Sequence, residues 1–369
     1  MFPRIKQFIT RFDWILFFAV FLLVCFGLIE LYSIGLGREG VDLGFFRRQL
    51  FFALAGLGIM LIFSLLNYRL FFNYAGYIFL LAAILLVAVL LFGQTIRGTR
   101  GWIYIGDFIR FQPVEFVKIA LLVFFSRYFY SASVRREPIK HFFISGLSVL
   151  FLSGLVMLQP DFGSAVLLFL LWLVFIPVAG FKKIYFFLVV AMLLGVFASG
   201  WLFFFQDYQK ERILTFLNPE KQAMDQGYNI AQAIIAVGAG RLAGRGIGFG
   251  SQSQLKFLPE AQNDFIYAVV SEELGLLGAG LLIFFFAVIF YRLFHYVRRG
   301  ISNDGLFSLY GLAVLIFLEM FINIGMNIGL LPVIGISLPF VSYGGSALWA
   351  NMIMIGIAQS IIIRSKTTH

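Results

Sequence analysis

Long apolar runs recur along the whole chain, and short polar stretches separate them. A run of about eighteen or more apolar residues is long enough to cross a bilayer as a helix. Such runs lie at 13–36, 45–66, 70–92, 113–130, 141–158, 163–180, 183–205, 264–294, 306–330 and 346–364. The pattern predicts an all-α, polytopic integral membrane protein with about ten transmembrane helices.

The longest interruption of this pattern is a polar stretch between the seventh and eighth runs, at about 206–263. Long connections of this kind are usually functional. Within it, YNIAQAIIAVGAG places Ile230, Ile234 and Val237 at helical spacing, which predicts a short helix in or dipping into the membrane interface. No polar stretch is long enough for a separate soluble unit, so we expect residues 1–369 to form one transmembrane domain.

The composition excludes a soluble protein, because 61% of the 369 residues are hydrophobic, only 12% are charged and the mean hydropathy is +0.95. The single cysteine, Cys25, excludes disulfides and a cysteine metal site. The N-terminus is basic, and the apolar run after it is too long for a signal-peptide core. We therefore expect an uncleaved first span.

The net charge of +10 carries topological information, because the basic residues lie in short loops. Basic loops favour the cytoplasmic side, so we expect cytoplasmic N- and C-termini and extracytoplasmic loops at 93–113 and 206–263. The basic residues on the expected cytoplasmic side are Arg4, Lys6, Arg11, Arg69, Arg135, Arg136, Lys140, Lys182, Lys183, Arg298, Arg299, Arg364 and Lys366.

Charged side chains inside membrane spans are costly and mark candidate functional sites. Glu115 and Lys118 are spaced i, i+3 and share a helix face. They form either a buried ion pair that locks helices together or a cation held ready for an anionic group. Asp161, between two spans, is either a helix N-cap or a functional carboxylate.

Asp264 opens the eighth span at its expected outer end. A carboxylate there suits the positive end of a helix, so a simple cap is one interpretation. The other is a general base at the mouth of the bundle. Glu272 and Glu273, about two turns further along, are interpreted as support or packing.

Two outer stretches carry arginines that are suited to phosphate binding. The first, GTRGWIYIGDF and the residues before it, holds Arg97, Arg100 and Trp102, and the tryptophan is also typical of an interfacial anchor. We treat Arg100 and Trp102 as candidates.

The second stretch, GAGRLAGRGIGFGSQSQLKFLPE, is rich in glycine and holds Arg241, Arg245 and Lys256. It follows no strand, which argues against a dinucleotide or P-loop motif. A flexible re-entrant turn with basic anchors fits it better.

Taken together, QPVEFVK, LQPDFGSA, SQLKFLPEAQNDFIYAVVSEELG and MNIGLLPVIGISLPFVSYGGSALWANM resemble the SEDS family (shape, elongation, division and sporulation). The resemblance covers nearly the whole chain, with the motifs in the family's order. It implies a ten-span bundle in the bacterial cytoplasmic membrane that polymerises lipid II into peptidoglycan strands on the outer face. It also implies a partner, a class B penicillin-binding protein transpeptidase.

The family's functional residues carry over by position. Asp264 matches its essential aspartate, Glu115 and Lys118 match a sensitive pair, and Asp161 matches the acidic residue of its QPD motif. Arg100 and Trp102 match its polar loop. SLLNYRLF and LPFVSYGG resemble the elongation branch (RodA) more than the division branch (FtsW). The chain departs from the family pattern at Gln262, Asn263 and Ala347.

The implied reaction is a glycosyl transfer with a pyrophosphate leaving group. The acceptor hydroxyl needs a base, for which Asp264 is the candidate, and the leaving group needs cations. Lys118, Arg100, Arg241 and Arg245 are the candidate cations, and a divalent ion such as Mg²⁺ or Mn²⁺ is the alternative. A flippase for the same lipid and an inert scaffold for the transpeptidase are the rival functions. The sequence predicts no nucleic-acid partner.

Overall fold

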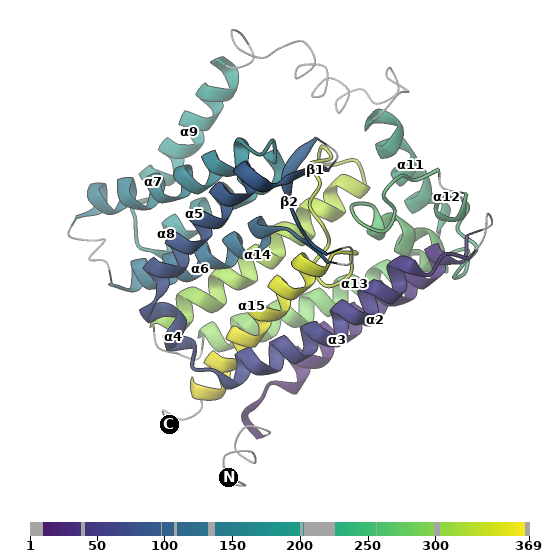
Figure 1. Ribbon diagram of the computed structural model, residues 1–369, viewed down its shortest axis with the longest axis horizontal. Coiled ribbons are helices and arrows are strands. Elements are labelled where there is room, and N and C mark those ends of the chain that lie inside the picture. The colour runs from purple at the N-terminus through teal and green to yellow at the C-terminus, as the bar shows by residue number, and fades with distance from the viewer. Residues whose placement is uncertain are drawn as a thin grey trace.

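The computed structural model describes residues 10–37, 41–96, 98–106, 109–131, 137–199, 202, 226–255, 257–298 and 303–365. Each predicted span contains one long helix (Figure 1), which confirms the predicted helical membrane bundle. The ten helices are α2 (Trp14–Gly35), α3 (Gly44–Leu65), α5 (Ala75–Phe92), α6 (Pro113–Ser131), α7 (Pro138–Met157), α8 (Phe162–Val178), α9 (Lys183–Ser199), α13 (Ile266–Arg298), α14 (Asn303–Asn327) and α15 (Gly345–Ser365).

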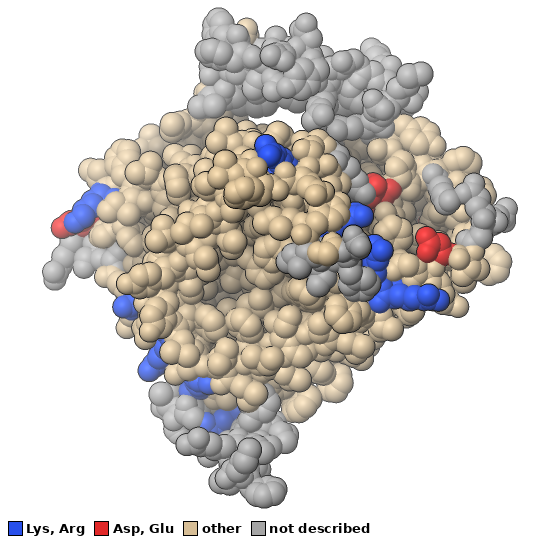
Figure 2. Space-filling view, in the orientation of Figure 1, with Lys and Arg blue, Asp and Glu red and all other residues tan. Residues whose placement is uncertain are grey.

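Length and apolar composition allow α2, α3, α5, α7, α13, α14 and α15 to cross a membrane. Helices α8 and α9 are shorter but also apolar, and α6 carries three charged side chains, those of Glu115, Lys118 and Arg127. Figure 2 shows that charges on the visible face gather toward the ends of the helices, with uncharged surface between them. This distribution is that of a multi-pass membrane protein.

Shorter elements build the connections. They are α4 (Tyr68–Asn73), α11 (Gln226–Ala239), α12 (Ser251–Gln254), β1 (Gln94–Ile96), β2 (Thr99–Ile105) and β3 (Ile109–Phe111). Helix α11 is the short helix predicted within 206–263. The strands form an antiparallel sheet in the order β1-β2-β3, which the apolar pattern did not predict. Arg97, Lys256 and residues 206–225 lie outside the described part of the chain.

Helices α2 and α13 are joined by polar contacts at both ends. Near the end of the bundle where α2 begins and α15 ends (Figure 1), Arg292 on α13 forms an ion pair with Asp13, with 2.7 Å between Nη2 and Oδ2. At the far end, the Ser33 hydroxyl on α2 donates to Glu273 Oε2 on α13 at 2.5 Å. The segment from Asp13 to Ser33 spans roughly 30 Å at 1.5 Å per residue, which is the thickness of the hydrocarbon core. The two contacts therefore lie about one hydrocarbon thickness apart along the bundle.

Helix α13 is broken at Gly275, where φ is 67° and ψ is −164°. The segment after α11 fills the break. The N–H groups of Leu276 and Leu277 donate to the carbonyls of Arg241 and Leu242, at 2.8 and 3.1 Å. In return, the N–H of Arg245 donates to the carbonyl of Glu272 at 3.0 Å. Backbone groups that a helix break frees must find partners at membrane depth, and here a re-entrant segment supplies them.

We expect Gly275→Ala to lower the free energy of unfolding by about 2 kcal/mol, through a strained positive φ and a steric clash. An added Cβ would lie 2.3 Å from the backbone nitrogen of Gly244. Gly280→Ala, on the same helix, is the matched control because nothing lies within 4 Å of its Cβ position. Unfolding of both purified variants measures the difference, and equal stability would contradict the prediction.

Candidate functional site

The backbone that carries Asp264 is held at three consecutive carbonyls. The carbonyl of Gln262 accepts from the N–H of Tyr343 at 2.9 Å, and that of Asn263 accepts from the Ser342 hydroxyl at 2.7 Å. The carbonyl of Asp264 itself accepts from the side-chain amides of Asn323 and Asn327, at 3.0 and 2.9 Å. Contacts from α14 and from the segment before α15 therefore fix the direction in which the Asp264 side chain leaves the backbone.

Asp264 lies outside the N-cap position of α13, because the helix begins at Ile266. The amide oxygen of Asn327 accepts from the N–H of Ala268 at 3.1 Å, so a side chain from α14 caps this helix. The Asp264 side chain is half-buried, and its Oδ2 lies 4.0 Å from where a Cβ on Gly335 would be. Gly335 has φ 73°. The carboxylate thus lies beside the Gly335 loop, where glycine leaves space next to it.

The two departures from the family pattern beside Asp264 have a shared partner. The side-chain amides of Gln262 and Asn263 donate to Oε2 of Glu260, at 3.2 and 2.8 Å. Both amides therefore stabilise the turn that precedes Asp264.

Glu115 and Lys118 form the predicted ion pair on α6, with 2.6 Å between Lys118 Nζ and Glu115 Oε2. Lys118 also donates to Glu319 Oε1 on α14, which makes a buried triad. The Lys118 side chain is only 5% exposed, and Glu319 Oε2 has no hydrogen-bond partner within the described residues. The triad joins two helices, and its cation is already matched by two carboxylates. This geometry favours the locking role.

Asp161 is the N-cap of α8. Its Oδ1 accepts from the N–H of Ser164 at 3.0 Å, and its Oδ2 accepts from the Ser164 hydroxyl at 2.8 Å. Of the two interpretations of this residue, the helix cap therefore fits the contacts.

Arg100 lies on β2, and its guanidinium caps the end of α5. Its Nε donates to the carbonyl of Gly93 at 3.0 Å, and its Nη2 to that of Leu91 at 3.1 Å. Cationic side chains stabilise the free carbonyls of a helix C-terminus. Trp102, half-buried, pairs with Gln94 in the sheet. Arg100 thus stabilises the end of α5, and Trp102 lies in the sheet that follows this helix.

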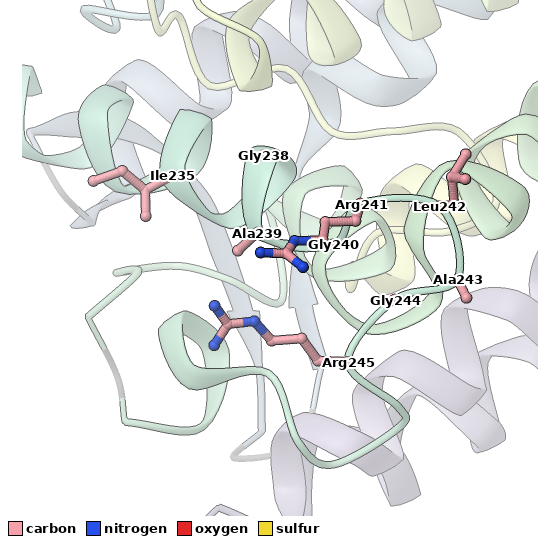
Figure 3. Close-up of a pocket in the computed structure, with 9 residues that line it drawn as sticks. All are labelled: Ile235, Gly238, Ala239, Gly240, Arg241, Leu242, Ala243, Gly244 and Arg245. Atoms are coloured by element: carbon pink, nitrogen blue, oxygen red, sulfur yellow. The ribbon is translucent and has the colours of Figure 1, made fainter.

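Arg241 and Arg245 line an open pocket of about 810 Å³ beside the break in α13. Figure 3 shows both guanidinium groups directed into the same opening, one from each side of the glycine-rich turn. Arg245 Nη1 donates to the Ser251 hydroxyl at 2.6 Å. The structure therefore brings these two sequence candidates together.

Glu272 and Glu273, both fully buried, anchor the turn beyond this pocket. Glu272 accepts from the N–H groups of Gln252 and Ser253, at 2.9 and 3.2 Å, and so holds the start of α12. Glu273 accepts from the N–H of Gly248 at 3.1 Å. The supporting role expected of these two glutamates matches their contacts.

Glu30 was missed by the sequence analysis. It is fully buried on α2, and neither carboxyl oxygen has a hydrogen-bond partner in the described residues. The carboxyl group of Glu273 is close enough to interact with that of Glu30 electrostatically. The available signal in the sequence was one charged residue inside the apolar run 13–36.

Within the described part of the chain, no group of three or more His, Cys, Asp or Glu side chains is arranged to hold a metal ion. A divalent cation stays a prediction, because Mg²⁺ is often held by one or two carboxylates together with phosphates of the ligand.

Comparison with known proteins assigns the family. Residues 13–367 match the FtsW/RodA/SpoVE family model, described as "Cell cycle protein". The chain belongs to this family. The match includes Asp264, the buried triad and the arginine pocket, and it confirms the resemblance found in the sequence motifs.

Two relatives and one solved structure illustrate the likeness. Peptidoglycan glycosyltransferase MrdB of Escherichia coli K12 is 36% identical over 89% of this chain and 88% of its own. Probable peptidoglycan glycosyltransferase FtsW of Coxiella burnetii is also 36% identical, with the same coverage. A chain described under "Structural coordination of polymerization and crosslinking by a peptidoglycan synthase complex" aligns with a TM-score of 0.82 and 27% identity, over 96% of this chain and 98% of that one. Identity does not separate the elongation branch from the division branch.

We expect Lys118→Met to lower the free energy of unfolding by about 3–5 kcal/mol, because it leaves two buried carboxylates without their cation. The triple variant Glu115→Gln/Lys118→Met/Glu319→Gln removes every charge of the triad and should recover most of that loss. Unfolding of the purified proteins in detergent measures both. A Lys118→Met protein as stable as wild type would show that the triad does not lock α6 to α14.

Proposed function

We propose that this protein polymerises lipid II into peptidoglycan glycan strands, with Asp264 as the general base. The observation that carries the proposal is the position of Asp264. It lies at the end of the bundle where α14 ends, on a backbone held at three carbonyls. The names of the relatives, which are peptidoglycan glycosyltransferases, support the activity.

The proposed reaction joins two lipid-linked substrates. Asp264 takes the proton from the acceptor sugar hydroxyl as its oxygen attacks the anomeric carbon of the donor. The bond from that carbon to the donor's pyrophosphate breaks, and the pyrophosphate leaves with the electron pair. A pyrophosphate is a good leaving group, so a base at the acceptor matters more than an acid at the donor. The fixed backbone reduces the freedom lost on reaching the reactive geometry.

The charge that develops on the leaving group needs compensation. Lys118 is a poor source, because two carboxylates already neutralise it and it is buried. Arg100 keeps part of its guanidinium exposed beside the sheet, and we retain it as a candidate. A Mg²⁺ or Mn²⁺ ion is the proposed alternative.

We place the protein in the bacterial cytoplasmic membrane, with both termini in the cytoplasm and Asp264 outside. The distribution of basic residues supports this orientation. We also propose a class B penicillin-binding protein as its partner, and a solved neighbour from a complex that coordinates polymerization with crosslinking supports a partner of this kind. The elongation role (RodA-like) is our first expectation, and the division role (FtsW-like) is the alternative.

Asp264→Asn should lower the rate of glycan polymerisation by about 10²–10⁴-fold, because an amide cannot act as the base. The assay uses the purified protein with its cognate transpeptidase, lipid II and a divalent cation, and it measures strand length and rate.

Asp161→Asn is the matched control, because it makes the same chemical change at a residue that caps a helix. Asparagine is an equally good N-cap, so this variant should polymerise near the wild-type rate. Equal activity of Asp264→Asn and wild type would remove Asp264 from the role of base.

A single displacement predicts that the new glycosidic bond has the configuration opposite to that of the donor. One base and no covalent carboxylate intermediate give this result. Nuclear magnetic resonance of the polymer, compared with the donor lipid, measures the configuration. Retention would instead require a covalent glycosyl-enzyme intermediate and would contradict the mechanism.

A further inference from the structure

The pocket with two arginines lies on the opposite side of α11 from Asp264. Ala233 and Ala236 are buried against Phe265, the neighbour of Asp264. Ile235 and Gly238, two positions further along in each case, line the pocket. Two residues turn a helix by about 200°, so the two pairs face opposite directions. The arginines therefore open on the side of α11 that faces away from Phe265.

The pocket lies at the level of the contact between Ser33 and Glu273, about one hydrocarbon thickness from the contact between Asp13 and Arg292. The turn that carries Arg245 donates to the carbonyls of Glu272 and Glu273, at 3.0 and 2.9 Å. Leu242 and Leu277, beside the pocket, are 68% and 70% exposed. Exposed apolar side chains next to guanidinium groups fit the depth at which lipid phosphates meet the hydrocarbon.

The chemistry of the pocket fits a phosphate group. Among the described residues that line it, none is acidic, and two are arginines. The Arg241 guanidinium makes no hydrogen bond or ion pair with other described residues. The backbone of Arg241 has a positive φ of 49°. Such a backbone is unfavourable for a non-glycine residue and is often found at functional sites. With no polar contact to other described residues, this guanidinium can bind phosphate oxygens in a bidentate manner.

We propose that this pocket binds the pyrophosphate of the acceptor lipid, a site distinct from the one where the donor's pyrophosphate leaves. This inference rests on the proposed function. The donor's pyrophosphate is bonded to the reacting carbon, so it must lie beside Asp264. The acceptor's pyrophosphate is separated from its reacting hydroxyl by two sugar rings, so its binding site lies away from the base. The arginine pocket is in such a place, and it opens at the level where a polyprenyl tail enters the membrane.

The test uses Arg241→Asn/Arg245→Gln in the full-length protein. Asparagine tolerates the positive φ at 241, and glutamine keeps a polar side chain at 245, so both changes remove charge with little strain. Arg127→Gln is the control, because it removes an arginine charge from α6, outside the residues that line the pocket. Unfolding measurements confirm that each variant is folded.

Native mass spectrometry in phosphatidylcholine nanodiscs counts undecaprenyl pyrophosphate molecules bound per chain. The double variant should bind one fewer than wild type, whereas Arg127→Gln and Asp264→Asn should bind the wild-type number. The lipid II KM of the double variant should rise at least tenfold, with kcat within a few-fold of wild type. Binding to Asp264→Asn does not depend on catalysis, so a failure of the proposed reaction and a failure of this site give different results.

Two outcomes would overturn the proposal. The first is an unchanged number of bound pyrophosphates in the double variant. The second is displacement of the arginine-dependent molecule by an equal concentration of phosphatidylglycerol, which would assign the pocket to an anionic phospholipid headgroup.

Discussion

The position of Asp264 depends on the hydrogen bonds to the carbonyls of residues 262–264. Each of these carbonyls has a donor from a distant part of the chain, either α14 or the segment before α15. The two asparagines on α14 are one turn apart, so their amides reach the same carbonyl. Asn327 also caps α13. The same side chain thus caps the helix and holds the carbonyl of Asp264, two residues before it, which couples the geometry of the carboxylate to the packing of α13 against α14.

The break in α13 places a second polar centre on the same helix. A continuous helix would leave no backbone groups for the turn at 240–246. The break at Gly275 frees them and the turn pairs with them, while Glu272 and Glu273 hold residues 248–253 beyond the turn. One helix therefore organises two regions of different chemistry, a carboxylate near its start and an arginine pocket at its break. The proposed reaction between two lipid-linked substrates requires a base at the acceptor hydroxyl and cations for the pyrophosphate groups.

The sequence predicted the bundle because apolar runs of membrane length need no tertiary information to be recognised. It also predicted α11 and the contact between Glu115 and Lys118, since both follow from spacing along one helix. Spacing along the chain does not reveal the contact between Lys118 and Glu319, because Glu319 lies on another helix. The hydrogen bonds from Arg100 to the end of α5 and the sheet at 94–111 join separate segments of the chain. They therefore produce no periodic pattern in the sequence. The pairing of the 240–246 turn with the broken α13 was hidden for the same reason, since Gly275 looks like any glycine in a span.

The central claim is that Asp264 acts as a base in its ionised form. The most direct measurement is the pH dependence of kcat/KM for lipid II, in wild type and in the residual activity of Asp264→Asn. For wild type, we predict a rate that rises about tenfold per pH unit on the acidic side and then levels off, as one carboxyl group loses its proton. The residual rate of Asp264→Asn should lack this acidic limb. An identical acidic limb in the variant would contradict the claim, because another group would then carry the essential ionisation.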